Sequence, residues 1–424
     1  MEDVLQAMQE RGLLEAVSDE PALRQALRAR RVTCYAGFDP SADSLHIGNL
    51  MAIIGLMHFQ RGGHRPLAVV GGGTGMIGDP SGKTQERPLL TLDEVERNLA
   101  GIRAQLARFL DFAAPDNPAL LVNNYDWLGR WSVIDFLRDV GKHFPLGYML
   151  GKESVRRRED AGISYTEFSY MLLQAADFAH LYQHFGCECQ LGGGDQWGNI
   201  TAGIELIRRS LGGAAYGLTV PLLTTASGVK FGKTEAGAVW LDAERTSPYQ
   251  FYQYWLNVDD RDAVRYLGYF TFLPMARIAE LEQATREHPE RRETQRELSQ
   301  EVTRLVHGAE ALAGAERASQ VLFGGQIQGL SDRVLAEVFQ EAPATALPRA
   351  RLEQGLPLLD LLTEAGLAPS KGEARNLVRG GGVYLNNERV DDERLVIGTA
   401  HLASEHLLVL RTGKKRYHLL RFAG

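Results

Sequence analysis

Two short segments of the sequence combine small residues with groups that can bind a phosphate chain. In the first, His46 and Gly48 stand where the turn SADSLHIGN leads into a helix. A helix N-terminus presents free backbone N–H groups and the positive end of the helix dipole, Gly48 permits close approach of a phosphate, and His46 can donate a hydrogen bond to it. In the second, Lys230 and Lys233 lie on the glycine-bounded loop ASGVKFGKTEAG, from which they can reach a phosphate chain. Alone, each segment also fits an ordinary helix cap or a solvated loop, so the pair carries the argument.

A third glycine-rich segment, GGGTGMIGDPSGKT at residues 71–84, matches two nucleotide-binding motifs only in part. Three of its glycines have the dinucleotide-binding spacing, but no acid ends a second strand about 20 residues later. Glu94 instead forms a capping box with Thr91 and opens a helix. The P-loop motif fails because its first glycine would fall at Ile77. We therefore expect a tight turn between a strand and a helix.

A polar stripe runs along the apolar segment FSYMLLQAADFAHLYQHF. Tyr170, Gln174 and Asp177 occupy positions i, i+4 and i+7, so they share one face of a helix. Apolar residues on nearly every other side indicate that the helix is largely buried. Buried polar groups need hydrogen-bond partners, and a ligand can supply them. The stripe is therefore a candidate binding site.

Four potential zinc ligands lie at the end of this segment and just after it. They are His180, His184, Cys187 and Cys189. A structural zinc site usually places CxxC-type pairs on turns, whereas these histidines share a helix with apolar neighbours and the cysteines lie in a strand-like run. We expect no protein-bound metal here.

The elements that must position these residues alternate in type along the first half of the chain. Strand-like runs such as VTCYAGFD, RPLAVVGGG and GCECQLGGGDQ are separated by helical patterns. This alternation predicts an α/β fold in which a Rossmann-like parallel sheet carries helices on both faces.

The pattern changes along the second half of the chain, and four regions result. We expect the α/β domain at residues 1–240 and a separate helical domain at 241–325. A linker containing two prolines is expected within 326–352, and a small α+β module at 353–424.

Composition limits the class of protein. The chain has 424 residues, 44% of them hydrophobic and 23% charged, and a net charge of -7. It has three cysteines, no signal-peptide pattern and no apolar run as long as the roughly 18 residues of a membrane span. We expect a cytoplasmic protein of several domains, in which any RNA contact comes from local basic patches.

Such patches occur in the C-terminal module. Lys371, Arg375 and Arg379 repeat at i, i+4 and i+8 on one helix face, and the tail contains Lys414, Lys415 and Arg416. A basic helix face is often only solvated surface, but two patches in one small module favour contact with phosphate.

Together the HIGN and KFGKT segments resemble the paired HIGH and KMSKS signatures of class I aminoacyl-tRNA synthetases. Further segments resemble the bacterial tyrosyl-tRNA synthetases: YAGFDP (35–40), GDPSGK (78–83), residues 170–177 and GGDQWGN (193–199). The resemblance covers essentially the whole chain, including the C-terminal module, which is similar to the αL-type RNA-binding domain. Asn49 departs from the pattern, because many members carry a second histidine there; Asn keeps a hydrogen-bond donor without the imidazole.

The resemblance implies a role for each site residue in binding tyrosine. Asp177 and Tyr35 are expected at the phenol hydroxyl, as acceptor and donor. The α-ammonium group is expected at Tyr170, Gln174 and Asp79, and the carboxylate near Gln196.

It also implies the ATP site and the reaction. Expected ATP-binding residues are Gly37, Asp39, His46, Gly48, Asn49, Gly193, Asp195, Lys230 and Lys233. The tyrosine carboxylate attacks the α-phosphorus and displaces pyrophosphate with Mg²⁺. Positioning and cations meeting the developing charge carry the catalysis. The residues expected to act on that charge are His46, Lys230, Lys233, Thr234, Lys83 and Arg87.

The implied partners are L-tyrosine, ATP, tRNA(Tyr) and a second copy of the chain in a homodimer. Arg208, Arg209 and the run at residues 156–158 match regions that contact the tRNA acceptor stem, in addition to the basic patches of the C-terminal module. Two alternatives stay open: a tryptophanyl enzyme of the same subclass, and a noncatalytic RNA-binding protein with a degenerate synthetase fold. The pair Tyr35 and Asp177 argues against the first, and the intact signatures argue against the second.

Overall fold

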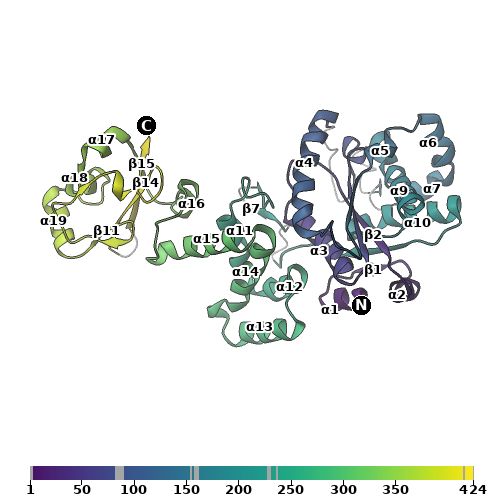
Figure 1. Ribbon diagram of the computed structural model, residues 1–424, viewed down its shortest axis with the longest axis horizontal. Helices are drawn as coiled ribbons and strands as arrows, with labels where there is room; N and C mark the ends of the chain where they lie inside the picture. The colour runs from purple at the N-terminus through teal and green to yellow at the C-terminus, as the bar shows by residue number, and fades with distance from the viewer. Residues whose placement is uncertain are drawn as a thin grey trace. The chain divides into compact units, whose positions relative to one another are not determined.

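The computed structural model describes residues 3–81, 90–152, 155–156, 162–226, 231–234, 237–413 and 416–423, with Lys233 and Thr234 described by their backbone. The chain divides into two compact units (Figure 1). The first comprises Met1–Thr246 and Val258–Val306, and the second comprises Ser247–Asn257 and His307–Gly424. Each unit is described by itself below.

A six-stranded sheet forms the centre of the first unit, in the order β1-β6-β5-β2-β3-β4. The strands are β1 (Ala16–Val17), β2 (Thr33–Phe38), β3 (Arg65–Val70), β4 (Leu120–Asn123), β5 (Cys187–Gly193) and β6 (Tyr216–Val220). Strands β2 to β6 are parallel, and β1 is antiparallel to β6. The predicted parallel α/β sheet is confirmed.

Helices cover both faces of this sheet (Figure 1). Helices α3 (Ile47–Arg61) and α4 (Leu92–Phe109) lie on one face, and α9 (Tyr165–Phe185) and α10 (Trp197–Leu211) lie on the other. Glycines allow the close packing: a Cβ atom on Gly55 of α3 would lie 2.6 Å from Leu191, and one on Gly217 of β6 would lie 2.1 Å from Ile200 of α10. The side chains of neighbouring strand residues therefore enter two separate layers of core.

Local signals fix the ends of the helices that carry the site. The Ser164 side chain caps the N-terminus of α9, and Gly186, with φ 61°, ends it in the left-handed conformation. Thr91 and Glu94 form the predicted capping box of α4. The other helices of this unit are α1 (Val4–Glu10), α2 (Glu20–Ala29), α5 (Tyr125–Leu128), α6 (Val133–Asp139), α7 (Leu146–Leu150), α12 (Asp260–Phe270), α13 (Met275–Glu287) and α14 (Glu293–His307). A short hairpin, β7 (Lys233–Thr234) and β8 (Gly237–Ala238), completes it.

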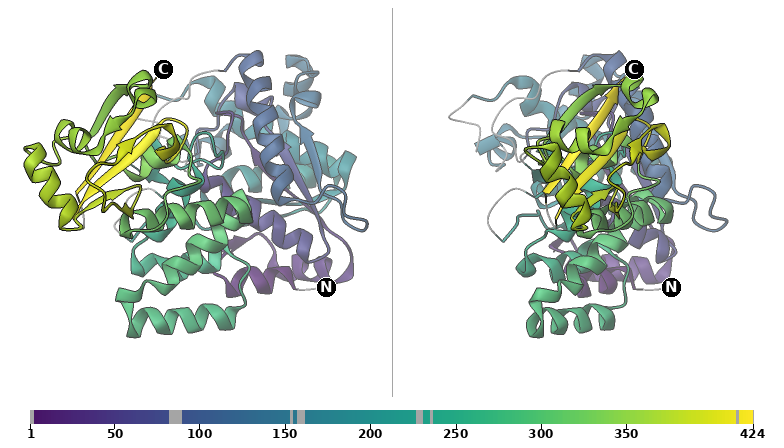
Figure 2. Two further views of the ribbon diagram at one scale, coloured as in Figure 1. Left: turned by 60° about the vertical axis from the view of Figure 1, so that its left-hand side comes forward. Right: turned by 90° about the vertical axis from the view of Figure 1, so that its left-hand side faces the viewer.

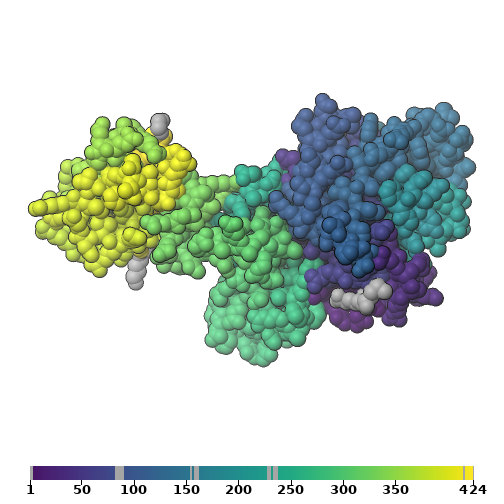
Figure 3. Space-filling view, viewed as in Figure 1, coloured from purple at the N-terminus to yellow at the C-terminus, as the bar shows by residue number. Residues whose placement is uncertain are grey.

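The second unit contains a five-stranded sheet in the order β12-β11-β14-β15-β9, whose long strands are yellow in Figure 2. These strands are β9 (Ala344–Pro348), β11 (Val383–Leu385), β12 (Glu388–Arg389), β14 (Leu407–Thr412) and β15 (Arg416–Ala423). A second pair joins β10 (Leu356–Pro357) to β13 (Val396–Ile397). The helices are α11 (Pro248–Leu256), α15 (Ala309–Gln320), α16 (Asp332–Val338), α17 (Arg349–Gln354), α18 (Leu358–Glu364) and α19 (Lys371–Arg379). On the face seen in Figure 3 the yellow-green and yellow atoms of residues beyond 340 form one continuous body.

The structure divides the C-terminal half differently from the sequence prediction. The helices expected as one domain at 241–325 separate, because α11 packs on α15 in the second unit whereas α12 packs on α3 in the first. The range 326–352, expected to be a linker, contains α16, β9 and most of α17. Strand β9 pairs in parallel with β15, so this range is part of the folded unit.

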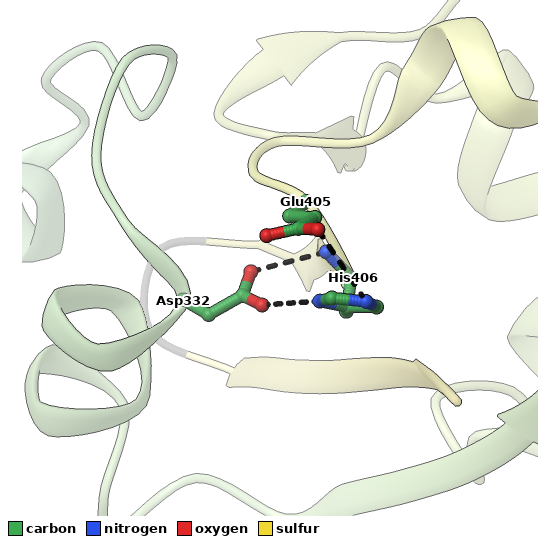
Figure 4. Close-up of side chains that lie close together, drawn as sticks. All are labelled: Asp332, Glu405 and His406. Carbon is green, nitrogen blue, oxygen red and sulfur yellow. Dashed lines mark hydrogen bonds and ion pairs between the residues drawn. The ribbon is translucent and has the colours of Figure 1, made fainter. Parts of the chain in front are cut away.

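Asp332 provides a further contact between that range and the sheet (Figure 4). Its carboxylate accepts hydrogen bonds from the backbone N–H of His406 (3.1 Å) and pairs with the imidazole Nδ1 of His406 (2.7 Å). These bonds join the start of α16 to the start of β14. Among the described residues, no helix is long and apolar enough to cross a membrane.

Candidate active site

A cavity of about 450 Å³ opens at the carboxyl ends of β2 and β5. This edge of a parallel sheet is where α/β folds commonly bind ligands. The cavity is lined by all the residues predicted for tyrosine and by the predicted ATP residues that precede the lysine loop: Tyr35, Gly37, Asp39, His46, Gly48, Asn49, Asp79, Tyr170, Gln174, Asp177, Gly193, Asp195 and Gln196. The fold therefore brings five separate sequence segments to one place. Their individual roles stay predictions.

Asp177 lies at the buried end of the cavity. One carboxylate oxygen accepts a hydrogen bond from the indole Nε1 of Trp127 (2.7 Å), and the other accepts one from the Nδ2 of Asn124 (2.8 Å). Burial raises the pKa of Asp177 to about 8, although the bonds from Asn124 and Trp127 act to lower it. The carboxylate is thus held at a fixed angle, and each oxygen keeps a lone pair for a ligand.

Two polar atoms beside Asp177 have no hydrogen-bond partner among the described residues. They are the hydroxyl of Tyr35 and the Oε1 of Gln190, which both line the cavity. Burial raises the pKa of Tyr35 well above its usual value, so its hydroxyl stays protonated and can donate. A buried polar group without a partner costs about 1–3 kcal/mol. A polar ligand group at this end of the cavity would remove that cost.

A network of amides forms one wall of the cavity. Gln196 donates to Asp79 (2.7 Å) and accepts from Gln174 (3.2 Å) and from Asn199 (3.2 Å). The other carboxylate oxygen of Asp79 accepts from the backbone N–H of Ser81 (2.9 Å). Asp79 is buried, and its negative charge suits an ammonium group.

Asp39 and Tyr170 meet from two different elements. The Tyr170 hydroxyl donates to Asp39 Oδ2 at 3.2 Å, and the Thr74 hydroxyl donates to Asp39 Oδ1 at 2.9 Å. Gly71 has to lack a side chain here, because a Cβ atom would lie 2.1 Å from Asp39 Oδ1. The GGG turn after β3 therefore gives the carboxylate room, which agrees with the predicted tight turn.

The HIGN segment opens α3 as predicted. His46 is the N-cap, and its Nδ1 accepts the backbone N–H of Gly48 at 3.0 Å. The neutral imidazole must then carry its proton on Nε2, which makes that nitrogen a hydrogen-bond donor. Asn49 Oδ1 accepts the backbone N–H of His46 (3.1 Å), so Asn49 closes a capping box. A donor and a helix N-terminus thus sit together at the cavity.

The KFGKT loop is bonded to the HIGN segment through one residue. Val239 donates its N–H to the carbonyl of Gly232 (3.0 Å) and accepts the N–H of Ile47 on its own carbonyl (3.0 Å). The isolated bridge between His46 and Trp240 continues this contact. Lys233 and Thr234 lie on β7 beside it, whereas Lys230, Lys83 and Arg87 lie outside the described residues.

The histidines and cysteines weighed as zinc ligands separate into two environments. Cys187 and Cys189 are fully buried on β5, while the rings of His180 and His184 on α9 lie at a tilt, with centroids 4.3 Å apart. Among the described residues, the group of three potential ligands with atoms within 4.8 Å of one another is Asp332, Glu405 and His406 in the second unit (Figure 4).

The predicted RNA-binding bases are exposed, and several are paired with acids. Arg208 and Arg209 of α10 both bond to Glu205, and hydrogen bonds from these arginines lower the pKa of Glu205 to about 2. On α19, Lys371 pairs with Asp360 (2.5 Å), and Arg375 (3.7 Å) and Arg379 (2.8 Å) pair with Glu393. Arg416 donates to the carbonyl of Gly366. Arg156 is exposed, whereas the rest of that arginine run, Lys414 and Lys415 lie outside the described residues.

Several cavity residues were missed by sequence reasoning. They are Thr74, Asn124 and Gln190, with Asn199 and Trp127 behind the cavity wall, bonded to Gln174 and Asp177. Asn124 directly follows β4 and Trp127 lies on the short helix α5 after it, so their position after a parallel strand was a usable signal. Asn199 is one turn from Gln196 and could have been found by helical spacing.

Comparisons with known proteins agree along the whole chain. A family model described as tRNA synthetases class I (W and Y) matches residues 27–324, and a tyrosine–tRNA ligase SYY-like C-terminal domain matches residues 335–420. A tyrosine–tRNA ligase of Roseiflexus castenholzii is 56% identical over 424 residues, covering 99% of this chain and 100% of that protein. The tyrosine–tRNA ligase 1 of Bacillus subtilis is 50% identical over 424 residues, covering 100% of both. A C-terminally truncated mitochondrial tyrosyl-tRNA synthetase of Aspergillus nidulans matches with a TM-score of 0.69 and 30% identity, covering 76% of this chain and 95% of that one.

Proposed function

The chain belongs to the class I tRNA synthetases of the tryptophan and tyrosine group, and we propose that it is the tyrosine enzyme of that group. It activates L-tyrosine with ATP to tyrosyl-adenylate and pyrophosphate, and then transfers tyrosine to the 3′ end of tRNA(Tyr). Identity of half or more over the full length with tyrosine–tRNA ligases supports this proposal. The observation that carries it is the pair formed by Asp177 and the Tyr35 hydroxyl, which has no hydrogen-bond partner among the described residues.

This pair suits a phenol better than other aromatic side chains. A phenol hydroxyl can donate to Asp177 and accept from Tyr35, which satisfies both buried groups. Phenylalanine would leave the Tyr35 hydroxyl without a partner, at about 1–3 kcal/mol, and would place an apolar ring against the carboxylate of Asp177. An indole N–H could donate to Asp177 but offers no acceptor to Tyr35. The geometry therefore favours tyrosine over phenylalanine and tryptophan.

The remaining groups orient the reacting atoms. Asp79, Gln174 and Tyr170 surround the expected place of the α-ammonium group, with Gln196 toward the carboxylate. One carboxylate oxygen attacks the α-phosphorus, forming the acyl-phosphate bond while the bond to the pyrophosphate oxygen breaks. Since the nucleophile is already an anion, no base is required, and positioning supplies much of the rate.

Cations and N–H donors meet the charge that develops on the pyrophosphate. We assign this task to the Nε2–H of His46 and the N-terminus of α3, and the cap that His46 forms on α3 supports the assignment. We assign the same task to Lys230, Lys233, Thr234, Lys83 and Arg87, and the ATP ribose to Gly193 and Asp195. Mg²⁺ is expected to enter with ATP, as a counter-ion of its phosphates.

Amino-acid-dependent pyrophosphate exchange tests the activity and the substrate together. The purified protein should incorporate labelled pyrophosphate into ATP with tyrosine and not with tryptophan or phenylalanine at the same concentration. Exchange with tryptophan alone would assign the chain to the other branch of the family. Absence of exchange with every amino acid would support the noncatalytic alternative.

For tRNA, we propose that the α19 face and the neighbouring tail contact phosphates. The pairing of Arg375 and Arg379 with Glu393 adds a condition, because a phosphate must compete with that carboxylate. Glu393→Gln should then strengthen tRNA binding, and Arg375→Gln should weaken it and reduce its salt dependence. A filter-binding titration at several salt concentrations measures both. Unchanged affinity in both variants would remove α19 from the RNA-binding surface.

We also propose that two copies of the chain associate through an apolar surface on the first unit. This apolar surface consists of Trp131, Val133, Ile134, Leu137, Leu146, Leu150 and Tyr165, all exposed. Helix α6 has only seven residues and buries none of them, although Val133 and Ile134 are 74% and 72% exposed. So short a helix is marginal without packing, and contiguous apolar surface of this kind marks association sites. Helices α6 and α7 lie at the edge of the first unit (Figure 1), where a second copy has access.

Sedimentation velocity measures this association. Ile134→Asp should convert a dimer into a monomer at micromolar concentration, because a charge would be buried in the apolar contact. Val396→Asp, an exposed apolar residue of the second unit, is the matched control and should sediment as the original protein does. A dimeric Ile134→Asp protein would contradict the proposed surface.

A cytoplasmic location remains part of the proposal, in keeping with three free, buried cysteines, and cell fractionation tests it.

A further inference from the structure

The indole of Trp127 is held by two residues of α9. Its Nε1 donates to Asp177 Oδ1 at 2.7 Å, and its face stacks on the imidazole of His180, with ring centroids 4.4 Å apart and an interplanar angle of 11°. Asp177 and His180 are three residues apart, so they project from the same side of α9. One contact therefore fixes the edge of the indole, and the other fixes its plane.

These two contacts set the orientation of Trp127 together with the core residues around it. It lies on α5, which has only four residues, and its side chain is buried in the core beneath the sheet. A four-residue helix has little rigidity of its own. If the indole tilted about its attachment, the N–H would move away from Asp177 Oδ1 first, because it is on the rim of the ring. His180 stacks on the face of the indole and therefore opposes this tilt.

His180 is suited to stacking as a neutral ring. Burial, with the nearby His184, lowers its pKa to about 4, so the imidazole carries no charge at neutral pH. His184 is exposed, and its ring lies 4.3 Å from that of His180 at a tilt of 37°. The stacked pair is therefore His180 with Trp127, and the indole connects it to the carboxylate of Asp177.

We infer that His180 is a positioning residue for recognition of the substrate's phenol, acting through Trp127 on the carboxylate of Asp177. The inference rests on the proposed function, since it assigns the phenol to Asp177. His180 does not line the cavity, so it acts without contact with the substrate. Its loss should weaken the hold on the tyrosine side chain and leave the ATP site unaffected.

Steady-state pyrophosphate exchange with His180→Ala, His180→Phe and His184→Ala tests this role. In His180→Ala, KM for tyrosine should rise between about 2- and 10-fold, the range expected for one misaligned hydrogen bond, while KM for ATP stays constant. The ratio of kcat/KM for tyrosine to that for phenylalanine should fall by a similar factor. His180→Phe keeps a flat ring and should restore both quantities, and His184→Ala should match the original protein because it does not stack on Trp127.

The ratio of kcat/KM for tyrosine to kcat/KM for phenylalanine distinguishes a positioning role of His180 from a loss of protein stability. Both constants are measured on the same sample, so the folded fraction of the protein cancels in their ratio. An unchanged ratio in His180→Ala, an equal loss in His184→Ala, or a failure of His180→Phe to restore the ratio would each overturn the inference. The original protein provides the other distinction: if it did not exchange with tyrosine, the proposed function would fail whatever the variants did.

Discussion

Asp177→Asn should stabilise the first unit increasingly as the pH rises. Asp177 is 3% exposed, and burial raises its pKa to about 8 in the folded protein against a usual value of 3.8. Between these two values the folded protein retains a proton that the unfolded chain releases. Stability therefore falls as the pH rises through this window, and the loss is complete above the folded pKa. Asparagine cannot titrate, so the variant escapes the loss.

The magnitude follows from the width of the window. Each pH unit corresponds to about 1.36 kcal/mol, so the free energy of unfolding of the original protein should fall by up to about 4 kcal/mol, relative to the variant, between about pH 5 and about pH 8. Asparagine also turns its amide toward one of the two donors, Asn124 or Trp127. That conflict costs about 1–3 kcal/mol at every pH. The free energy of unfolding of the variant should thus rise relative to that of the original protein from pH 5 to pH 8, and near pH 8 the variant should be the more stable of the two.

Urea unfolding followed by tryptophan fluorescence at a series of pH values measures this difference. The contributions of groups that titrate in both proteins cancel in the difference between their free energies of unfolding. The slope of this difference with pH therefore reports on Asp177. Asp126→Asn, an exposed acid on α5, provides the baseline for removing one negative charge. A difference between variant and original protein that stayed flat with pH would show that Asp177 is ionised throughout and would refute the reasoning. The stabilised variant should also lose tyrosine-dependent exchange.

Three further results are expected. Tyr35→Phe should keep activation but reduce the preference for tyrosine over phenylalanine by about 0.5–1.5 kcal/mol, read from the two specificity constants; an unchanged ratio would remove Tyr35 from the phenol. Lys230→Ala and Lys233→Ala should slow single-turnover adenylate formation strongly with little change in equilibrium tyrosine binding, and loss of binding with normal activation would contradict their assignment. A chain ending at Gln320 should retain pyrophosphate exchange and lose tRNA charging, whereas a chain ending at Pro348 should aggregate because it exposes the apolar residues of α16 that face β14 and β15. Normal charging by the shorter chain at physiological salt would assign RNA binding to the first unit.

The parts of the fold that could be predicted are those set by local patterns. The parallel sheet and α9 were predicted because alternating strand and helix patterns and a long buried segment are visible in the sequence. The division of the helical region between the two units could not be predicted from the sequence. Helices α11 and α12 have similar local patterns, but α11 packs on α15 in the second unit and α12 packs on α3 in the first. The range at 326–352 was read as a linker from its prolines, yet Pro348 ends β9 at the edge of its sheet, a position where proline is tolerated.

In the site, too, the residues that could be predicted are those set by local sequence patterns. Helical spacing identified Tyr170, Gln174 and Asp177, since all three lie on one element. The groups that hold Asp177 come from the segment after β4, 50 residues or more earlier in the chain, and no local spacing connects them to α9. The pairing of Arg379 with Glu393 was hidden for the same reason.

The contact between Gly48 and His46 limits the order in which a duplicated gene could lose this signature. A Cβ atom on residue 48 would lie 2.8 Å from the imidazole Cε1 of His46. Any side chain at position 48 therefore displaces the histidine, even in a chain whose histidine codon is intact. Loss of His46 imposes no such constraint on Gly48. In a copy released from selection for catalysis, a substitution at position 46 costs only the cap of α3, whereas a substitution at position 48 alone already marks a copy whose signature histidine has lost its place.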